Sequence, residues 1–343
     1  MKKKTNKSVA YWTEREKRKL KGGLKDIEVI DKKLKRHYNI AAKDIETQIA
    51  KLFYKYAEDN ELSYKEAKKL LTGKEHKEWR MDLKSYIKEV EENNDKDLLL
   101  ELNTLSMKSR ISRLEEVFFY ANKHVDDVYK FQHEQVEELL KTSVSSNYYQ
   151  SIYDVQKFVG VGSSFSKLDE KKIVDVVKYP WSGKNYSERI WNNRQKLKYT
   201  LETNITQMVI QGNSPKKIAK NVAERMNVDY KNAMRLVHTE HSYIMSEASA
   251  MAMDETGVEL YQFLATLDNR TSQICQGLDL QVFYLKDRVV GLNASPMHPR
   301  CRSIEIPYFE DDISTRSARV GNGKTYYVPA NISYKEWYKK HVE

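Results

Sequence analysis

The sequence has few residues that cross-link a chain or interrupt its helices. Two cysteines, six prolines and 12 glycines occur among its 343 residues. So few cysteines exclude a disulfide scaffold and are typical of a protein that folds in a reducing cytosol. The sequence also lacks a run of about 18 apolar residues, so no membrane-spanning helix is expected. The basic N-terminal stretch MKKKTNKSVAYW lacks the apolar core of a signal peptide, so none is predicted.

The composition excludes a disordered chain and favours a soluble protein rich in exposed helix. Hydrophobic residues make up 40% of the chain, charged residues 31% and aromatic residues 11%, and this aromatic content is too high for disorder. The length suits two domains. The net charge of +10 favours a polyanionic partner such as nucleic acid, an anionic membrane or an acidic protein, although lysine-rich surfaces also serve solubility alone.

Residues 1–145 are predicted to form an elongated helical region. This stretch contains no proline, and its only glycines are Gly22, Gly23 and Gly73. Two segments carry apolar residues at helical spacing. They are Asp44 to Tyr56, with Ile45, Ile49, Leu52 and Phe53, and Met107 to Leu140, with Ile111, Leu114, Val117, Phe118, Ala121 and Val125. Because these helices are amphipathic, they are expected to pack as a bundle or to present a face to a partner.

The remainder is predicted to be a connector, residues 146–187, and an α+β domain, residues 188–343. The connector stretch is rich in Ser, Gly and Tyr and shows no sustained period. Three helices are then expected: one that ends at Gly212, one that begins at Ser214 and Pro215, and one that Asp229 caps. Gly257 is expected to end the third helix.

Strand patterns follow Gly257. The segments YQFLATLD, QVFYL, RSIEIPYF and KTYYVPA are rich in aromatic and β-branched residues with alternating polarity. The fold class is therefore predicted to be α+β, with a mainly helical N-terminal region followed by a C-terminal domain of three helices and a small antiparallel sheet. The terminal segment YKEWYKKHVE is expected to be a short helix.

A dense basic cluster opens the chain. It is either a solvated arm or an arm that binds DNA phosphates. Its candidate DNA-binding residues are Lys2, Lys3, Lys4, Lys7, Arg15, Lys17, Arg18 and Lys19.

One window gathers both cysteines, Cys275 and Cys301, with His298 three residues before the second. These three residues are candidate zinc ligands, and Asp268, His238 or His241 would complete the set. Alternatively, Cys275 is a nucleophile with His298 as its base, but nothing marks an oxyanion hole or an orienting third group. In the third and favoured interpretation the cysteines are small buried side chains that stabilise the fold, and a disulfide between them is a minor variant of it.

The stretch His238-Thr-Glu-His241 places two histidines on one helical face, where they either bind a metal together or form a polar surface. Its glutamate, Glu240, is a candidate buried partner for an arginine. The residues expected to have structural roles are Glu240, Asp268, Arg270 and Arg302. No phosphate-binding loop, carboxylate pair or catalytic triad is evident, so the chain is predicted not to be an enzyme.

Several stretches together resemble the phage head-morphogenesis family, the Mu F-like minor head proteins. They are WSGKNYSERIW, the turn from Gly212 to Pro215, RLVHTEHSYIMSEASAMAMDETGVELYQFLATLDNRTSQICQGLDLQVF, and SPMHPRCRSIEIP. The resemblance covers Tyr179 to Pro307. Many family members carry a cysteine where this chain has Ser272 and another where it has Ser303, which weakens the zinc hypothesis.

The resemblance implies a minor head protein of a tailed bacteriophage, present in few copies at the portal vertex and the procapsid interior. The implied partners are the portal protein, capsid or scaffold proteins and DNA, with no membrane partner. The implied location is the virion, with the host cytoplasm during assembly. Some relatives are fused to ADP-ribosyltransferase domains, but this chain lacks the matching Arg, Ser-Thr-Ser and Glu-x-Glu set. The alternatives are a zinc- or thiol-dependent enzyme and an effector ejected into the host.

Overall fold

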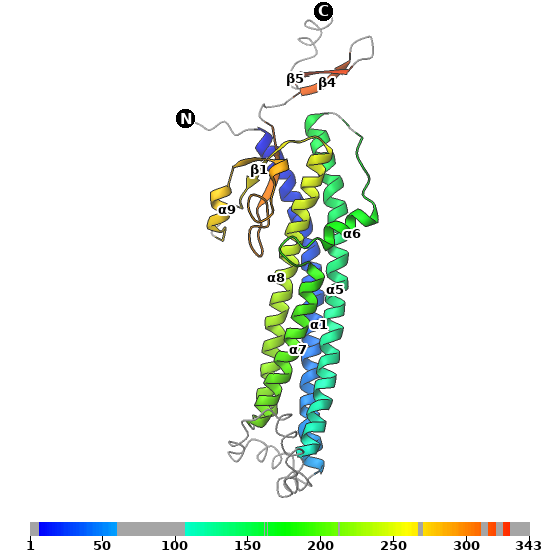
Figure 1. The fold of residues 1–343 in the computed structure, drawn as a ribbon, viewed down its shortest axis with the longest axis vertical. Helices are drawn as coiled ribbons and strands as arrows, with labels where there is room; N and C mark the ends of the chain where they lie inside the picture. Colours follow the sequence, from blue (N-terminus) through cyan, green and yellow to red (C-terminus); the bar gives the residue numbers. More distant parts are fainter. Residues whose placement is uncertain are drawn as a thin grey trace, which may run out of the picture. The chain divides into compact units, whose positions relative to one another are not determined.

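The computed structural model shows long helices followed by short antiparallel strands (Figure 1). It describes residues 7–59, 107–160, 162, 164–211, 213–266, 270–309, 315–319 and 325–329. Within these ranges the elements are α1 (Lys7–Asp59), α5 (Met107–Val159), α6 (Glu170–Lys178), α7 (Tyr186–Ile210), α8 (Pro215–Glu255), β1 (Leu260–Leu264), α9 (Gln273–Leu278), β2 (Val282–Tyr284), the 3-10 helix η2 (Leu285–Asp287), β3 (Ile304–Tyr308), β4 (Thr315–Arg319) and β5 (Thr325–Pro329). None of the described helices is long and apolar enough to cross a membrane.

The chain packs as two units, and each is assembled from separate segments. The first unit comprises Met1–Ile30, Gln135–Ser187 and Met234–Glu343, and the second comprises Asp31–Glu134 and Glu188–Ala233. The helices α1, α5 and α8 therefore contribute residues to both units.

The first unit packs a three-stranded sheet beside the ends of α1, α5 and α8. The strand order is β2-β1-β3 and both pairings are antiparallel, with Tyr261 opposite Phe283 on one side and Pro307 on the other. A buried core joins the sheet to the helices. Its members are Trp12, Val155, Met253, Val258, Tyr261 and Ile306. Because all of these side chains are large or branched and apolar, their burial stabilises the unit.

Small polar residues bring α5 and α8 together within the first unit. Asn147 on α5 donates its side-chain amide to the carbonyl of Met245 at 2.6 Å and to the hydroxyl of Ser249 at 2.9 Å. Next to these hydrogen bonds, Tyr148 and Ile152 pack on Ala248 and Ala252 of α8. The short side chains allow the two helices to approach each other closely, and the hydrogen bonds of the Asn147 side-chain amide fix their register.

The second unit contains a buried polar cluster among its helices. The hydroxyls of Tyr38 and Tyr129 both bond a carboxylate oxygen of Asp229, and Tyr38 also lies 2.9 Å from the side-chain oxygen of Gln132. Burial raises the pKa of Asp229, and the two tyrosine hydrogen bonds oppose that increase. Buried polar groups are stable when they are hydrogen-bonded in this way.

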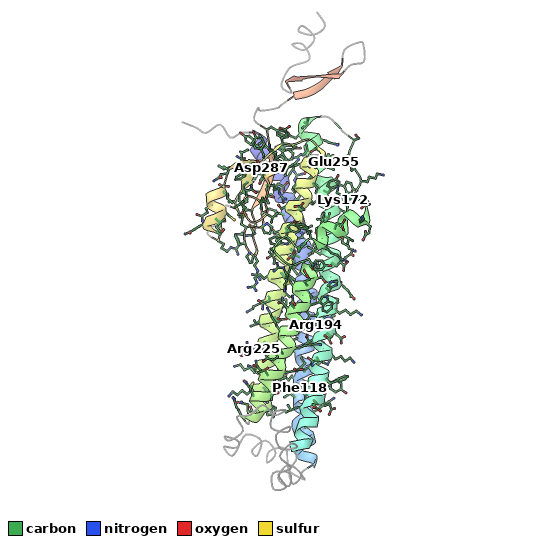
Figure 2. All side chains as sticks on the ribbon, viewed as in Figure 1. Phe118, Lys172, Arg194, Arg225, Glu255 and Asp287 are labelled. Carbon is green, nitrogen blue, oxygen red and sulfur yellow. The ribbon has the colours of Figure 1, made fainter. Side chains whose placement is uncertain are left out.

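A second polar contact of this unit lies between α5 and α7. Arg194, which Figure 2 labels, donates to Asp126 at 3.2 Å, and Lys198 donates to the same carboxylate at 2.7 Å. Asp126 is partly exposed, so this ion pair is expected to contribute modestly to stability.

The predicted fold class is confirmed. The described parts are mainly helical, and a small antiparallel sheet follows the last long helix. The helix start at Ser214 and Pro215 is also confirmed, because Pro215 is the first residue of α8 and the Ser214 hydroxyl accepts from the Lys217 amide at 3.4 Å. All four predicted strand segments contain strands.

Two secondary-structure predictions are wrong. Asp229 does not cap a third helix, because α8 runs without interruption from Pro215 to Glu255 and buries that carboxylate under two tyrosines. The connector stretch is not irregular at its start, because α5 continues to Val159. The division into 1–145, 146–187 and 188–343 stays a prediction. The terminal segment YKEWYKKHVE lies outside the described residues.

Candidate functional site

The candidate site in the first unit is built on α9 and the loop before β3. Ser272 begins α9, and its hydroxyl accepts from the backbone amide of Cys275 at 3.3 Å. The second cysteine, Cys301, lies in a turn closed by its own amide, which donates to the carbonyl of His298 at 3.0 Å. Each cysteine is therefore held in its own segment by a local hydrogen bond.

The three predicted ligand residues lie together. The Cys275 Sγ is 3.5 Å from the His298 Nε2 and 3.8 Å from the Cys301 Sγ. All three ligand atoms lie within 4.8 Å of one another, and both cysteines are free thiols.

A backbone carbonyl fixes the form of the His298 ring. Its Nδ1 lies 3.0 Å from the carbonyl oxygen of Pro299, and a carbonyl can only accept. Nδ1 therefore carries the proton, and the lone pair of Nε2 faces Cys275. Metal-binding histidines commonly have this outer hydrogen bond.

The surroundings of the thiols are apolar. Cys275, Cys301 and Phe263 form one buried cluster, against which Ala265, Leu278, Phe283 and Met297 pack. Burial raises the pKa of the Cys301 thiol, and backbone hydrogen bonds from Met297 and Ser303 offset this only in part. Cys275 is 1% exposed. A thiol that no substrate reaches is poorly placed to be a nucleophile.

The distances match those expected around a bound zinc ion. Zinc held tetrahedrally at ~2.3 Å from sulfur and ~2.0–2.1 Å from nitrogen separates two sulfurs by about 3.8 Å, and a sulfur from a nitrogen by about 3.6 Å. The observed separations are 3.8 and 3.5 Å. Among the described residues, the metal-competent group contains these three members and neither His238 nor His241. Asp268 lies outside the described residues.

The WSG segment contacts the helix that carries the HTEH stretch. The Trp181 indole donates to Glu240 at 2.9 Å, and its ring stacks on Tyr243 at 5.2 Å. Glu240 is buried, and burial was part of its predicted role. Its pairing with Arg270 or Arg302 stays a prediction. The role of Trp181 was not predicted, although a tryptophan in a polar Gly-Ser segment is a signal for such an anchor.

Comparison with known proteins identifies this part of the chain. Residues 199–306 match the family model described as Phage Mu protein F like protein. We call residues 199–306 the Mu F-like region. The Mu F-like region includes Cys275, His298 and Cys301, so the whole candidate site lies within it.

Two relatives extend the similarity beyond the Mu F-like region. Minor head protein GP7 of Bacillus phage SPP1 is 23% identical over 326 residues, which cover 90% of this chain and 92% of GP7. The NAD(+)–arginine ADP-ribosyltransferase EFV of Enterococcus faecalis is 23% identical over 282 residues, which cover 76% of this chain. The match covers 55% of that enzyme's own length. No solved structure matches the chain.

A buried polar network supports the Mu F-like region and was not predicted. Glu305 on β3 accepts from the Ser295 amide at 2.7 Å and from the Ser246 hydroxyl. Arg288 donates to the same hydroxyl and to Glu247, each at 2.7 Å. The signal in the sequence is a glutamate between two isoleucines of an otherwise apolar strand, and such a carboxylate requires partners when it is buried.

His241 lies apart from the thiols, against α1. A Cβ added to Gly23 would lie 2.4 Å from the Cε1 atom of His241. Burial lowers the pKa of His241 to about 4, and the nearby His238 is the second, smaller cause. The His241 ring is therefore neutral near pH 7. Neither histidine belongs to a metal-competent group of three or more among the described residues, and the paired metal site considered for this stretch stays a prediction.

The described members of the basic cluster fall into two classes. Arg15 pairs with Asp154 at 3.1 Å, and Lys19 pairs with Glu16; both basic side chains are largely buried. Lys17 and Arg18 are exposed. The side chains of Lys2, Lys3, Lys4 and Lys7 lie outside the described residues. Of the described members, only Lys17 and Arg18 can therefore reach a DNA phosphate without breaking a buried ion pair.

Proposed function

We propose that the protein is a minor head protein of a tailed bacteriophage. It acts by binding at the portal and the procapsid interior during head assembly or early genome delivery. The observation that carries this proposal is the similarity to GP7, which spans 90% of this chain and 92% of GP7. A match over nearly the full length of both chains supports a common role for the whole chain.

The candidate site supports a structural role for the thiol cluster. Its cysteines are buried, and the ligand atoms point toward one another rather than into solvent. Zinc bound there by Cys275, His298 and Cys301 would cross-link α9 to the loop before β3. Such a link joins segments that are far apart in the sequence, and this is how structural zinc stabilises small folds. Of the three residues considered as a fourth ligand, Asp268 is untested because it lies outside the described residues.

DNA contact is the second part of the proposal. The net charge is +10, and Lys17 and Arg18 of the basic cluster are exposed. Binding of this kind would be governed by phosphate neutralisation and would show little sequence preference.

Co-purification of the full chain tests the proposed function. Cutting the chain near residue 150 would divide α5, and both units use residues on either side of that cut. The intact protein is therefore mixed, in separate experiments, with the portal protein of its own phage, with empty procapsids and with double-stranded DNA. Retention on the portal or in procapsids supports the head role, and failure to bind either contradicts it.

A transferase activity is the competing proposal, supported by the similarity to the Enterococcus enzyme. The chain spans 55% of that enzyme and lacks the Arg, Ser-Thr-Ser and Glu-x-Glu set of such domains. Incubation with NAD⁺ and an arginine-containing acceptor protein distinguishes the two. The head role predicts no consumption of NAD⁺ above that of a heat-treated sample.

A further inference from the structure

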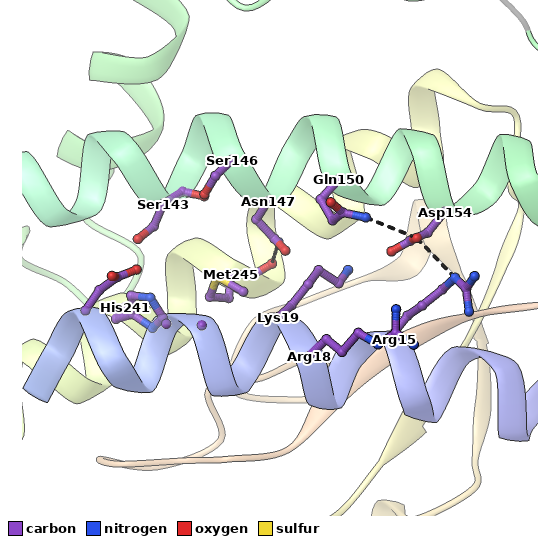
Figure 3. A pocket seen from close by; sticks show the side chains of 13 residues that line it. Arg15, Arg18, Lys19, Ser143, Ser146, Asn147, Gln150, Asp154, His241 and Met245 are labelled. Atoms are coloured by element: carbon purple, nitrogen blue, oxygen red, sulfur yellow. Dashed lines mark hydrogen bonds and ion pairs between the residues drawn. The ribbon is translucent and has the colours of Figure 1, made fainter.

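A polar pocket lies within the first unit, between α1 and α5, with α8 behind it (Figure 3). Its volume is about 360 Å³, whereas one water needs only ~10–15 Å³ of such space. All of the lining side chains except Met245 are polar or charged. The pocket therefore suits a polar ligand rather than an apolar one.

Each helix supplies lining residues one turn apart. They are Lys19 and Gly23 from α1, Ser143 and Asn147 from α5, and His241 and Met245 from α8. Residues four positions apart share a helical face, so three faces converge on one space. Gly23 has no side chain, and this leaves room for the His241 ring against α1.

Two of the lining side chains each have a buried polar atom with no hydrogen-bond partner among the residues that the structure describes. They are the Nε2 of His241 and the Oδ1 of Asn147. His241 is 6% exposed and Asn147 is 3% exposed. An unsatisfied buried polar atom costs about 1–3 kcal/mol, so a bound group that reached these two side chains would remove that cost. The amide nitrogen of Asn147 is already bonded to α8, which fixes its oxygen as an acceptor.

The charges of the lining favour an anion. Three cations, Arg15, Arg18 and Lys19, face two carboxylates, Asp26 and Asp154. Asp154 is engaged by Arg15 and by Gln150, at 3.1 and 3.2 Å. Lys19 is engaged by the neighbouring Glu16 and by Ser151.

Arg18 is the cation that is most available to a ligand. Its pairing with Glu14 is on the surface, where the two side chains are 71% and 61% exposed. Exposed pairs of this kind are weak and exchange readily. Asp26, the other lining carboxylate, is exposed and would oppose an anion close to it.

We propose that this pocket binds a phosphate-class oxyanion, with Arg18 as its principal charged contact. Hydrogen phosphate both donates and accepts. Its P–OH group can donate to the Asn147 oxygen, and its remaining oxygens can accept from Arg18, from Lys19 and from the His241 Nε2–H of one neutral tautomer. Free phosphate and the terminal monoester of a nucleotide or DNA end share this chemistry. The inference is independent of the proposed head role.

Calorimetric titration of the full chain with inorganic phosphate, at constant ionic strength, tests the proposal. Arg18→Gln removes the proposed contact from an exposed helix position and leaves the fold intact. Lys25→Gln is the matched control, because Lys25 is also exposed on α1 but does not line the pocket. Loss of one charge-assisted hydrogen bond predicts that Arg18→Gln weakens phosphate binding about tenfold or more, and that Lys25→Gln leaves it unchanged.

A second readout follows the buried histidine directly. The His241 imidazole resonances of the wild type are expected to shift on phosphate addition, with the midpoint that calorimetry gives. The absence of phosphate binding to the wild type overturns the proposal, as does equal binding by Arg18→Gln and the wild type. Titrations with adenosine monophosphate and with a 5′-phosphorylated oligonucleotide, against its unphosphorylated form, then distinguish the two sources of the phosphate.

Discussion

The Nε2 of His298 lies 3.5 Å from the Sγ of Cys275, although 23 residues separate them. The Pro299 carbonyl holds the imidazole with its lone pair toward the thiol. This contact joins α9 to the loop before β3, and zinc would convert it into a coordinate bond. The first prediction follows from it.

Protein purified from zinc-containing medium is expected to retain about one zinc per chain, and Cys301→Ser is expected to lose it. Chelation should lower the melting temperature of the wild type much more than that of Cys301→Ser, because the variant has no site to lose. Met297→Leu is the control, since Met297 packs on the cluster without offering a ligand of the predicted set. Wild-type protein that contains no metal and is insensitive to chelation would show that the cluster is stabilised by packing alone.

A matched glycine pair tests the packing of α1 in the first unit. A Cβ at Gly23 would lie 2.4 Å from the His241 ring, whereas one at Gly22 would meet nothing within 4 Å. Gly23→Ala is expected to lower the free energy of unfolding by about 1–3 kcal/mol through overpacking. Gly22→Ala is expected to raise it by about 0.5–1 kcal/mol through helix propensity. Urea unfolding measures both, and changes of the same sign would contradict the described packing.

Asp229 gives a pH-dependent prediction. Burial raises its pKa above the ordinary 3.8, so the folded state holds the carboxyl proton more firmly than the unfolded chain does. Its contribution to stability is therefore fully present below the unfolded pKa and is lost as the pH rises through the folded pKa. Asp229→Asn keeps an acceptor for Tyr38 and Tyr129 but never ionises.

The stability of the wild type relative to Asp229→Asn should consequently fall as the pH rises above 3.8. Urea unfolding of both proteins at a series of pH values measures this difference. A difference that does not change with pH would mean that Asp229 has the same proton affinity in both states. Asp229→Leu should be destabilised at every pH, because it removes the acceptor of two buried hydroxyls.

Salt dependence tests the predicted DNA contact. The logarithm of the binding constant should fall linearly with the logarithm of the salt concentration, with a slope of about −0.9 per phosphate contact. Lys17→Gln should reduce the magnitude of that slope by about 0.9, the contribution of one phosphate contact. Lys51→Gln, exposed on α1 outside the basic cluster, should leave it unchanged. Binding that does not depend on salt would exclude the basic cluster as a phosphate-binding arm.

Much of the Mu F-like region could be predicted because its signals are local. Pro215 and Gly257 lie just inside and just beyond the ends of α8, and the apolar strand segments alternate in the usual way. The proximity of Cys275, His298 and Cys301 was anticipated, because their residue types within one short window suggested a shared zinc site. These features depend on residues close in sequence, so tertiary packing did not overturn them.

The two secondary-structure predictions were wrong at places where tertiary contacts decide the local structure. Aspartate is favoured at helix N-caps, so Asp229 was predicted to begin a helix. Within α8 its carboxylate instead accepts hydrogen bonds from Tyr38 of α1 and Tyr129 of α5. The Ser-rich part of α5 is helical because small residues allow it to pack against α8. An apolar repeat was present there, with Val144, Tyr148, Ile152 and Val155 all buried. The polar pocket could not be predicted, because its residues come from three helices.

The head role is tested most directly by the protein content of purified particles. Quantitative mass spectrometry of procapsids and mature virions of the phage that encodes this chain measures its copy number relative to the portal protein. The account predicts that the chain is present in both particles at a few copies and is lost from procapsids assembled without portal protein. Absence from both particles, with the full amount of the chain in the infected-cell lysate, would contradict a minor head protein.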